Sequence, residues 1–152
     1  MIYAVFDIGG TNTRVAVTDD LEKLSKKTSF KTPETFSAGV KAITGAIDKL
    51  TDEKPVAIAG GIRGPLNEEK TGIVNDTKLE KWVGESVVAA LQKHYDVPVT
   101  LENDAAIAGL GEAVYGAGEG LEIVAYHTVS TGVGGVKIEN SAVDLASVGF
   151  EP

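Results

Sequence analysis

Two short apolar runs joined by a glycine turn open the chain, in the stretch AVFDIGGTNTRVAVTD at residues 4–19. Apolar residues alternate with others in each run, as in a strand that buries one face, and two adjacent glycines suit a tight turn between them. Asp7 stands near the end of the first run, just before Gly9 and Gly10. The stretch therefore predicts a β-hairpin with a carboxylate beside its turn.

A second stretch repeats this chemistry. VSTGVGGVKIE, at residues 129–139, again joins two apolar runs through hydroxyl residues and glycines. Two such hairpins suggest two lobes that each present backbone amides from a glycine turn. Because the sequence stops at Pro152, we expect only the beginning of the second lobe.

Hydrophobic periodicity predicts the elements between and around these hairpins. The predicted strands cover residues 2–8, 13–18, 25–31, 56–60, 97–102, 122–129 and 134–139. The predicted helices are Pro33–Leu50, capped by Thr32, then Leu79–Tyr95, and a third that starts at Asn103 or Asp104 and turns Ile107, Leu110 and Val114 inward. This order predicts an α/β fold with a mixed sheet flanked by helices.

Composition and charge argue against several classes of protein. There is no cysteine, so no disulfide framework or thiolate zinc site is expected in this chain, and the net charge of −8 argues against a nucleic-acid-binding surface. His94 and His127 show no metal-ligand spacing. No apolar run reaches the roughly 18 residues of a membrane span, and no secretory signal opens the chain, so we expect a cytoplasmic protein without membrane contact.

The glycine turn at residues 9–10 has two interpretations. Glycine amides can converge on an anion such as a phosphate, whereas the alternative is an ordinary hairpin turn. A carboxylate at the end of a buried strand is costly unless it is paired, hydrogen-bonded or near a metal, and a water-bridged Mg²⁺ on a nucleotide would satisfy Asp7. Neither a Walker A loop nor a helix-opening dinucleotide motif occurs.

Three further stretches place polar residues after predicted strands. In LENDAAIAGLGE, either Asn103 or Asp104 suits a helix N-cap; alternatively one caps while the other faces a cleft, where an ionised Asp104 can accept a proton from a hydroxyl that attacks a phosphoryl group. The loops AIAGGIRGPLN and GIVNDTKLEKW, with Gly61, Asn75 and Thr77, can line a ligand cleft, but surface turns and helix capping explain them equally well.

In this order the motifs resemble the ROK family of sugar kinases and related repressors, within the superfamily of hexokinases and actin. The matching pieces are DIGGTNTRVAV, AGGIRGP, TKLEKW, LENDAAIAGLGE and VSTGVGGVKIE. The resemblance implies an actin-like ATPase (ribonuclease H-like) lobe at 1–117, the start of a second lobe at 118–152, and glucokinase-like, ATP-dependent phosphorylation of a hexose or N-acyl hexosamine. ATP, Mg²⁺, a sugar substrate and a homo-oligomer follow as expected cofactors and partners.

The resemblance also implies residue roles. Asp104 corresponds to the catalytic base and Asn103 to a sugar ligand, with Gly61, Asn75, Thr77 and Glu151 as further candidate sugar contacts. The first phosphate turn corresponds to Asp7, Gly9, Gly10, Thr11 and Asn12, where Asp7 would hold Mg²⁺ through water. The second corresponds to Thr131, Gly132 and Gly134.

The family's remaining sugar ligands, zinc motif and adenosine site would follow Pro152. We therefore expect these 152 residues alone to be inactive. Two alternatives to a kinase are a non-catalytic sugar-sensing or regulatory module and an ATP-hydrolysing activator of the same superfamily.

Overall fold

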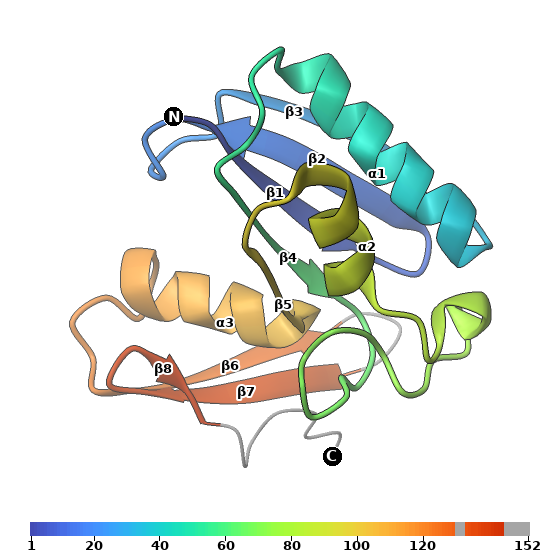
Figure 1. The fold of residues 1–152 in the computed structure, drawn as a ribbon. Coiled ribbons are helices and arrows are strands. Elements are labelled where there is room, and N and C mark those ends of the chain that lie inside the picture. Colours follow the sequence, from blue (N-terminus) through green and yellow to red (C-terminus); the bar gives the residue numbers. More distant parts are fainter. Residues whose placement is uncertain (130–132, 145–152) are drawn as a thin grey trace. The chain divides into compact units, whose positions relative to one another are not determined.

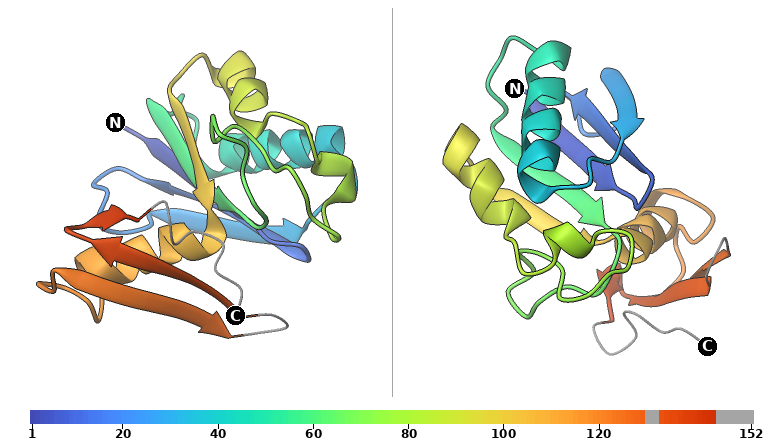
Figure 2. Two further views of the ribbon diagram at one scale, coloured as in Figure 1. Left: turned by 90° about the horizontal axis from the view of Figure 1, so that it is seen from below. Right: turned by 90° about the vertical axis from the view of Figure 1, so that its right-hand side faces the viewer.

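The computed structural model describes residues 1–129 and 133–144. The chain divides into two compact units, Met1–Glu102 and Asn103–Pro152. Figures 1 and 2 show the ribbon, and each unit is described by itself.

The first unit contains a five-stranded sheet in the order β3-β2-β1-β4-β5. Its strands are β1 Tyr3–Ile8, β2 Asn12–Thr18, β3 Lys26–Lys31, β4 Ala57–Ile62 and β5 Val99–Asn103. β1 pairs antiparallel with β2 and parallel with β4, so the sheet is mixed, as the sequence predicts. β1 lies at the centre, and the turn that follows it is therefore flanked by the ends of other strands.

Two helices, α1 (Phe36–Leu50) and α2 (Val87–Tyr95), pack on this sheet (Figure 2). Alternate residues of β1 share one core with both helices; the buried set includes Ala4, Phe6, Ile8, Ile43, Ile47 and Leu91. The other alternate residues of β1, Asp7 among them, point to the opposite face. The alternation seen in the sequence thus decides which side chains stay accessible.

The first helix begins later than the sequence predicts. Thr32 does not cap it, because its hydroxyl donates to the carbonyl of Gly9 at 2.7 Å. The helix starts at Phe36 after Thr35, whose side chain makes no capping hydrogen bond. Thr32 therefore supports the glycine turn instead of a helix end.

The predicted helix Leu79–Tyr95 is also wrong, because two elements occupy its place. A short 3₁₀ turn, η1 (Glu80–Trp82), ends before Gly84, which adopts a φ of +79° that breaks the helical path. α2 then starts after Ser86, whose hydroxyl accepts from the N–H of Ala89 at 3.0 Å. The backbone geometry at Gly84 thus separates the two segments.

Trp82 joins η1 to α1. Its ring is 1% exposed, its indole N–H donates to the Pro33 carbonyl at 3.1 Å, and it meets Phe36 edge-on with ring centres 5.5 Å apart. The ring lies directly over Gly39, where a Cβ would come within 2.0 Å of its Cζ2 atom. Only glycine leaves room for the indole at this point of α1.

The second unit packs a helix on a small antiparallel sheet, in the order β6-β7-β8. Its elements are α3 Asp104–Tyr115, β6 Ile123–Val129, β7 Val133–Glu139 and β8 Ala142–Val143. Small residues let α3 approach the strands, since a Cβ at Gly109 would lie 2.4 Å from Val136. Ile107, expected inward, is instead exposed, and Ala106 and Ala113 occupy the buried face.

The two compact units meet at residues 102–103, and the lobe boundary expected at 117–118 stays a prediction. α3 packs against β6 and β7, so it groups with the second hairpin.

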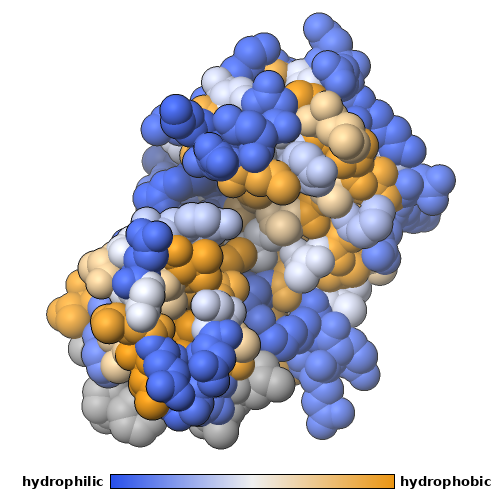
Figure 3. Space-filling view, turned by 90° about the vertical axis from the view of Figure 1, so that its left-hand side faces the viewer, coloured by the Kyte–Doolittle hydropathy of each residue, from blue (hydrophilic) through white to orange (hydrophobic). Residues whose placement is uncertain are grey.

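Exposed apolar side chains on the second unit include Leu121, Ile123 and Val129, and Figure 3 shows apolar surface over this unit. Within residues 1–129 and 133–144, no helix is long and apolar enough to cross a bilayer.

Candidate active site

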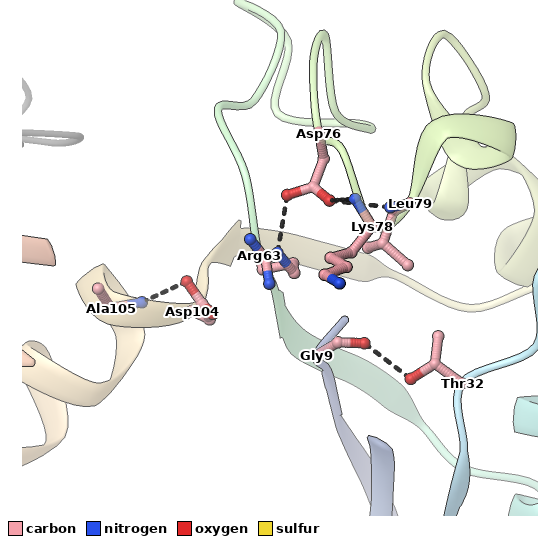
Figure 4. Close-up of polar contacts among 8 residues, drawn as sticks. All are labelled: Gly9, Thr32, Arg63, Asp76, Lys78, Leu79, Asp104 and Ala105. Carbon is pink, nitrogen blue, oxygen red and sulfur yellow. Dashed lines mark hydrogen bonds and ion pairs between the residues drawn. The ribbon is translucent and has the colours of Figure 1, made fainter. Parts of the chain in front are cut away.

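Hydrogen bonds from Thr32, in the segment that follows β3, anchor the turn between β1 and β2. Gly9 donates its N–H to the Asn12 carbonyl at 3.0 Å. Thr32 binds the turn twice: its N–H donates to the Thr11 carbonyl at 2.9 Å, and its hydroxyl donates to the Gly9 carbonyl (Figure 4). The N–H groups of Gly10 and Thr11 make no hydrogen bond to another described residue. An anchored turn with uncommitted donors is suited to an anion.

Asp7 points away from the core that contains its neighbour Ile8, so its carboxylate is not in the interior. Its side chain is 41% exposed, and one carboxylate oxygen accepts from Nη1 of Arg14 at 2.7 Å on the neighbouring strand. The expected cost of a buried carboxylate therefore does not arise. Magnesium is commonly held by one or two carboxylates together with substrate phosphates and water, so a half-exposed Asp7 beside the turn fits such an ion.

No group of three or more acidic or histidine side chains that could hold a metal by itself occurs among the described residues.

Two loops reach the turn from the other side. Arg63 directly follows β4, and its N–H donates to the Ile8 carbonyl at 3.0 Å. A Cβ at Gly10 would lie 2.8 Å from Nη1 of Arg63 and 2.9 Å from the Cβ of Lys78. Gly10 does not have a positive φ, so close approach by these residues, not backbone conformation, explains its glycine.

Asp76 fixes this arrangement. One of its oxygens accepts from Nε of Arg63 at 2.7 Å, and the other accepts from the N–H groups of Lys78 and Leu79 at 2.6 and 2.8 Å (Figure 4). The side chain of Asp76 is only 5% exposed. Asp76 therefore closes the turn that precedes η1, whose own N-cap, Leu79, makes no side-chain capping hydrogen bond.

The candidate sugar contacts of the first unit lie around the same turn. Gly61 is buried and pairs with Asp7 in the β1–β4 ladder. The Asn75 carbonyl lies 3.0 Å from the position of a Cβ on Gly64, a residue with a φ of +96°. Asn75 and Thr77 are both exposed. The structure thus gathers these residues near the turn, while their binding roles stay predictions.

Asn103 and Asp104 stand where β5 gives way to α3. Asn103 is the N-cap, because its side-chain oxygen accepts from the N–H groups of Ala105 and Ala106 at 3.0 and 3.1 Å. Asp104 is the first helical residue, and its Oδ1 accepts from Ala105 at 2.9 Å. A carboxylate in the first turn is favoured by the helix dipole, which stabilises its ionised form.

The second hairpin is described only in part. Gly134 pairs with Thr128 on β6, and a Cβ there would lie 3.9 Å from the side chain of Ala105. Within the second unit, this predicted phosphate residue therefore lies close to the start of α3. Thr131, Gly132 and Glu151 lie outside the described residues.

Sequence reasoning missed Thr32, Arg63 and Lys78. Arg63 stands inside the quoted motif AGGIRGP, and a cation directly after a buried strand, between glycines, was the available signal. Its partner Asp76 comes from a loop that only the folded chain brings near, so the pair itself had no local signature.

Comparison with known proteins matches residues 3–152 to the ROK family. The glucokinase of Streptomyces coelicolor is 31% identical over 130 residues, covering 85% of this chain and 41% of the relative; a fructokinase of Lactococcus lactis subsp. cremoris is 26% identical over 142 residues, covering 91% and 47%. A crystal structure of a ROK family glucokinase from Streptomyces griseus, in complex with glucose and AMPPNP, superposes with a TM-score of 0.83 at 27% identity, covering 94% of this chain and 46% of that one.

These matches confirm the resemblance read from the motifs and the actin-like ATPase fold class. The chain spans less than half the length of these two curated relatives.

Proposed function

Since the chain belongs to the ROK family, we propose that its natural gene product is an ATP-dependent sugar kinase that acts on a hexose or an N-acyl hexosamine. The observation that carries this proposal is the turn at Gly9–Thr11, which is anchored by Thr32 and offers two uncommitted N–H groups. Converging amides of this kind bind phosphate oxygens. The relatives named glucokinase and fructokinase support a hexose as acceptor.

In the proposed reaction, a sugar hydroxyl oxygen attacks the γ-phosphorus of ATP. The bond between that phosphorus and the oxygen bridging to the β-phosphate breaks, ADP leaves, and Asp104 accepts the hydroxyl proton. The amides of Gly10 and Thr11 stabilise negative charge on the phosphates. Mg²⁺, held through water by Asp7, would neutralise phosphate charge, as divalent cations do in such transfers.

We assign the sugar to Asn103, Gly61, Asn75, Thr77 and Glu151, and the second phosphate turn to Thr131, Gly132 and Gly134. Asn103 can hold a sugar hydroxyl only through donors or acceptors not used in capping, because its Oδ1 already binds two N–H groups of α3.

The test is a coupled assay of the natural gene product with Mg-ATP and a panel of glucose, fructose, mannose and their N-acetylated amino sugars. Asp104→Asn should lower kcat by about 10² to 10⁴, since it removes the base while its amide oxygen can still accept from Ala105. Asp96→Asn is the matched control. Asp96 is exposed, adopts a φ of +52° that asparagine tolerates, and ends α2.

Turnover of no sugar by the unchanged protein would refute a kinase. Sugar binding without ATP binding would instead identify a sugar-sensing module. If the kcat of the Asp104→Asn variant lay within a few-fold of that of the unchanged enzyme, Asp104 would be only a structural residue of α3.

A further inference from the structure

We propose that Arg63, oriented by Asp76, binds the terminal phosphates of the nucleotide at the Gly9–Gly10 turn. The proposal rests on the proposed kinase function and adds a residue to the phosphate site that neither the motifs nor the family match assigns.

The parallel pairing of β1 and β4 places Arg63 at the turn. Ile8 pairs with Ile62, so the residue after each strand emerges at the same edge of the sheet. The backbone N–H of Arg63 extends this pairing by donating to Ile8 at 3.0 Å. Its guanidinium then reaches Gly10, where Nη1 lies 2.8 Å from the position that a Cβ would occupy. The glycine therefore admits the cation next to the uncommitted amides.

Asp76 orients this cation without using its phosphate-binding edge. It takes only the Nε–H of Arg63, and the guanidinium forms no other hydrogen bond to a described residue, so both Nη groups are available to a ligand. Because Asp76 is nearly buried and is itself held by two backbone N–H groups, it is a rigid support. Arginine in a fixed orientation favours paired hydrogen bonds to phosphate oxygens.

A plain structural ion pair is the competing explanation. The Asp76 end of the pair is buried, but the side chain of Arg63 is 41% exposed, so the cation is accessible to a ligand. Its position beside free N–H donors, together with Lys78, instead makes the turn locally electropositive in a chain of net charge −8. Asp7 and Asp76 each have an arginine partner, and Lys78 adds one more positive charge beside the turn. Figure 4 shows Arg63 and Lys78 above Gly9.

The experiment compares binding of phosphate-bearing and phosphate-free ligands by titration calorimetry in the natural gene product. The ligands are Mg-AMPPNP, Mg-tripolyphosphate, adenosine and glucose. The variants are Arg63→Gln, Arg63→Lys and Asp76→Asn, which keeps an acceptor for Lys78 and Leu79. Lys81→Gln is the matched control, because Lys81 lies on η1 and pairs with Glu34. The change removes one positive charge and one ion pair without involving Gly10.

Arg63→Gln should weaken AMPPNP and tripolyphosphate binding about 10- to 100-fold, the loss typical of charge-assisted hydrogen bonds, with adenosine and glucose unchanged. Arg63→Lys should recover part of this loss. Asp76→Asn should give an affinity for the two phosphate ligands between those of the unchanged protein and Arg63→Gln. In turnover, the KM for ATP should rise while the KM for the sugar stays constant. Lys81→Gln should bind all four ligands normally.

Equal affinity of Arg63→Gln and the unchanged protein for tripolyphosphate would overturn the role of Arg63 and leave the kinase proposal standing. Equal losses for all four ligands would also overturn it, since they would show general distortion, which melting temperatures would reveal. Failure of the unchanged protein to bind either phosphate ligand would refute both proposals, and the sugar panel would identify that case separately.

Discussion

Replacing Gly39 with alanine should destabilise the first unit, whereas the same change at Gly45 of the same helix should not. A Cβ on Gly39 would lie 2.0 Å from Cζ2 and 2.2 Å from Cη2 of Trp82, and ordinary contact begins at 3.4 Å. The indole would have to shift by 1.4 Å, the difference between 3.4 and 2.0 Å. A Cβ on Gly45 meets nothing within 4 Å.

Several opposing contributions set the size of the effect. Overpacking a core typically costs about 1 to 3 kcal/mol. Moving the ring also weakens its hydrogen bond to Pro33 and its edge contact with Phe36, each worth about 0.5 to 1.5 kcal/mol. Alanine recovers about 1 kcal/mol through its better helix propensity. The net loss at Gly39 should be about 2 to 4 kcal/mol, while Gly45→Ala should gain up to about 1 kcal/mol.

Urea unfolding followed by tryptophan fluorescence measures both variants, because Trp82 is the only tryptophan in the sequence and reports directly on the contact. Circular dichroism at 222 nm, a standard helix signal, provides a probe independent of the indole. Stability changes of the same sign at both positions would refute the packing argument. So would an unchanged emission maximum in a destabilised Gly39→Ala variant, since the ring would not have moved.

Three further predictions follow from other contacts. Gly10→Val should weaken AMPPNP binding more than glucose binding, because its side chain would displace Arg63 and Lys78; calorimetry that finds equal losses would indicate a misfolded hairpin. Ser86→Ala should lower the unfolding free energy by about 1 kcal/mol and Ser86→Asn should preserve it, since Ser86 caps α2; matching urea curves for both would contradict this role. Burial, with the hydrogen bond to Asp48, raises the pKa of Tyr95, so the unfolded chain loses this proton first and stability should fall above about pH 10. Tyr95→Phe should remove that alkaline loss in urea melts taken across this pH range.

The sequence predicted the elements whose signals are local. Alternation around Asp7 predicted β1 and β2, and a capping residue at 103 or 104 followed by apolar residues at helical spacing predicted α3. The predicted start of α1 was wrong because Thr32, a good capping residue by its chemistry, instead donates to Gly9 in the turn between β1 and β2. Gly84 was a local signal that the second helix breaks, since it adopts a φ of +79° in the structure.

The candidate site shows the same limit. The glycine turn and the Asn103–Asp104 junction can be located from short motifs, because each depends on a few consecutive residues. The contact of Arg63 with Gly10 and Asp76 depends on the pairing of β1 with β4 and on the path of the loop after residue 72. No periodicity or propensity encodes that meeting, so only the folded chain reveals it.

The central place of β1 in its sheet has a consequence for the order in which the protein forms. β2 and β3 follow β1 directly along the chain, so the glycine turn belongs to a local meander, whereas β4 joins β1 only after α1 has been made. Non-local strand pairing is the slower step in folding. During synthesis the amides of the turn would therefore exist before Arg63 arrives beside them. A nucleotide that needs both would stabilise only chains in which β4 has docked, and would act late, as a check on completed assembly.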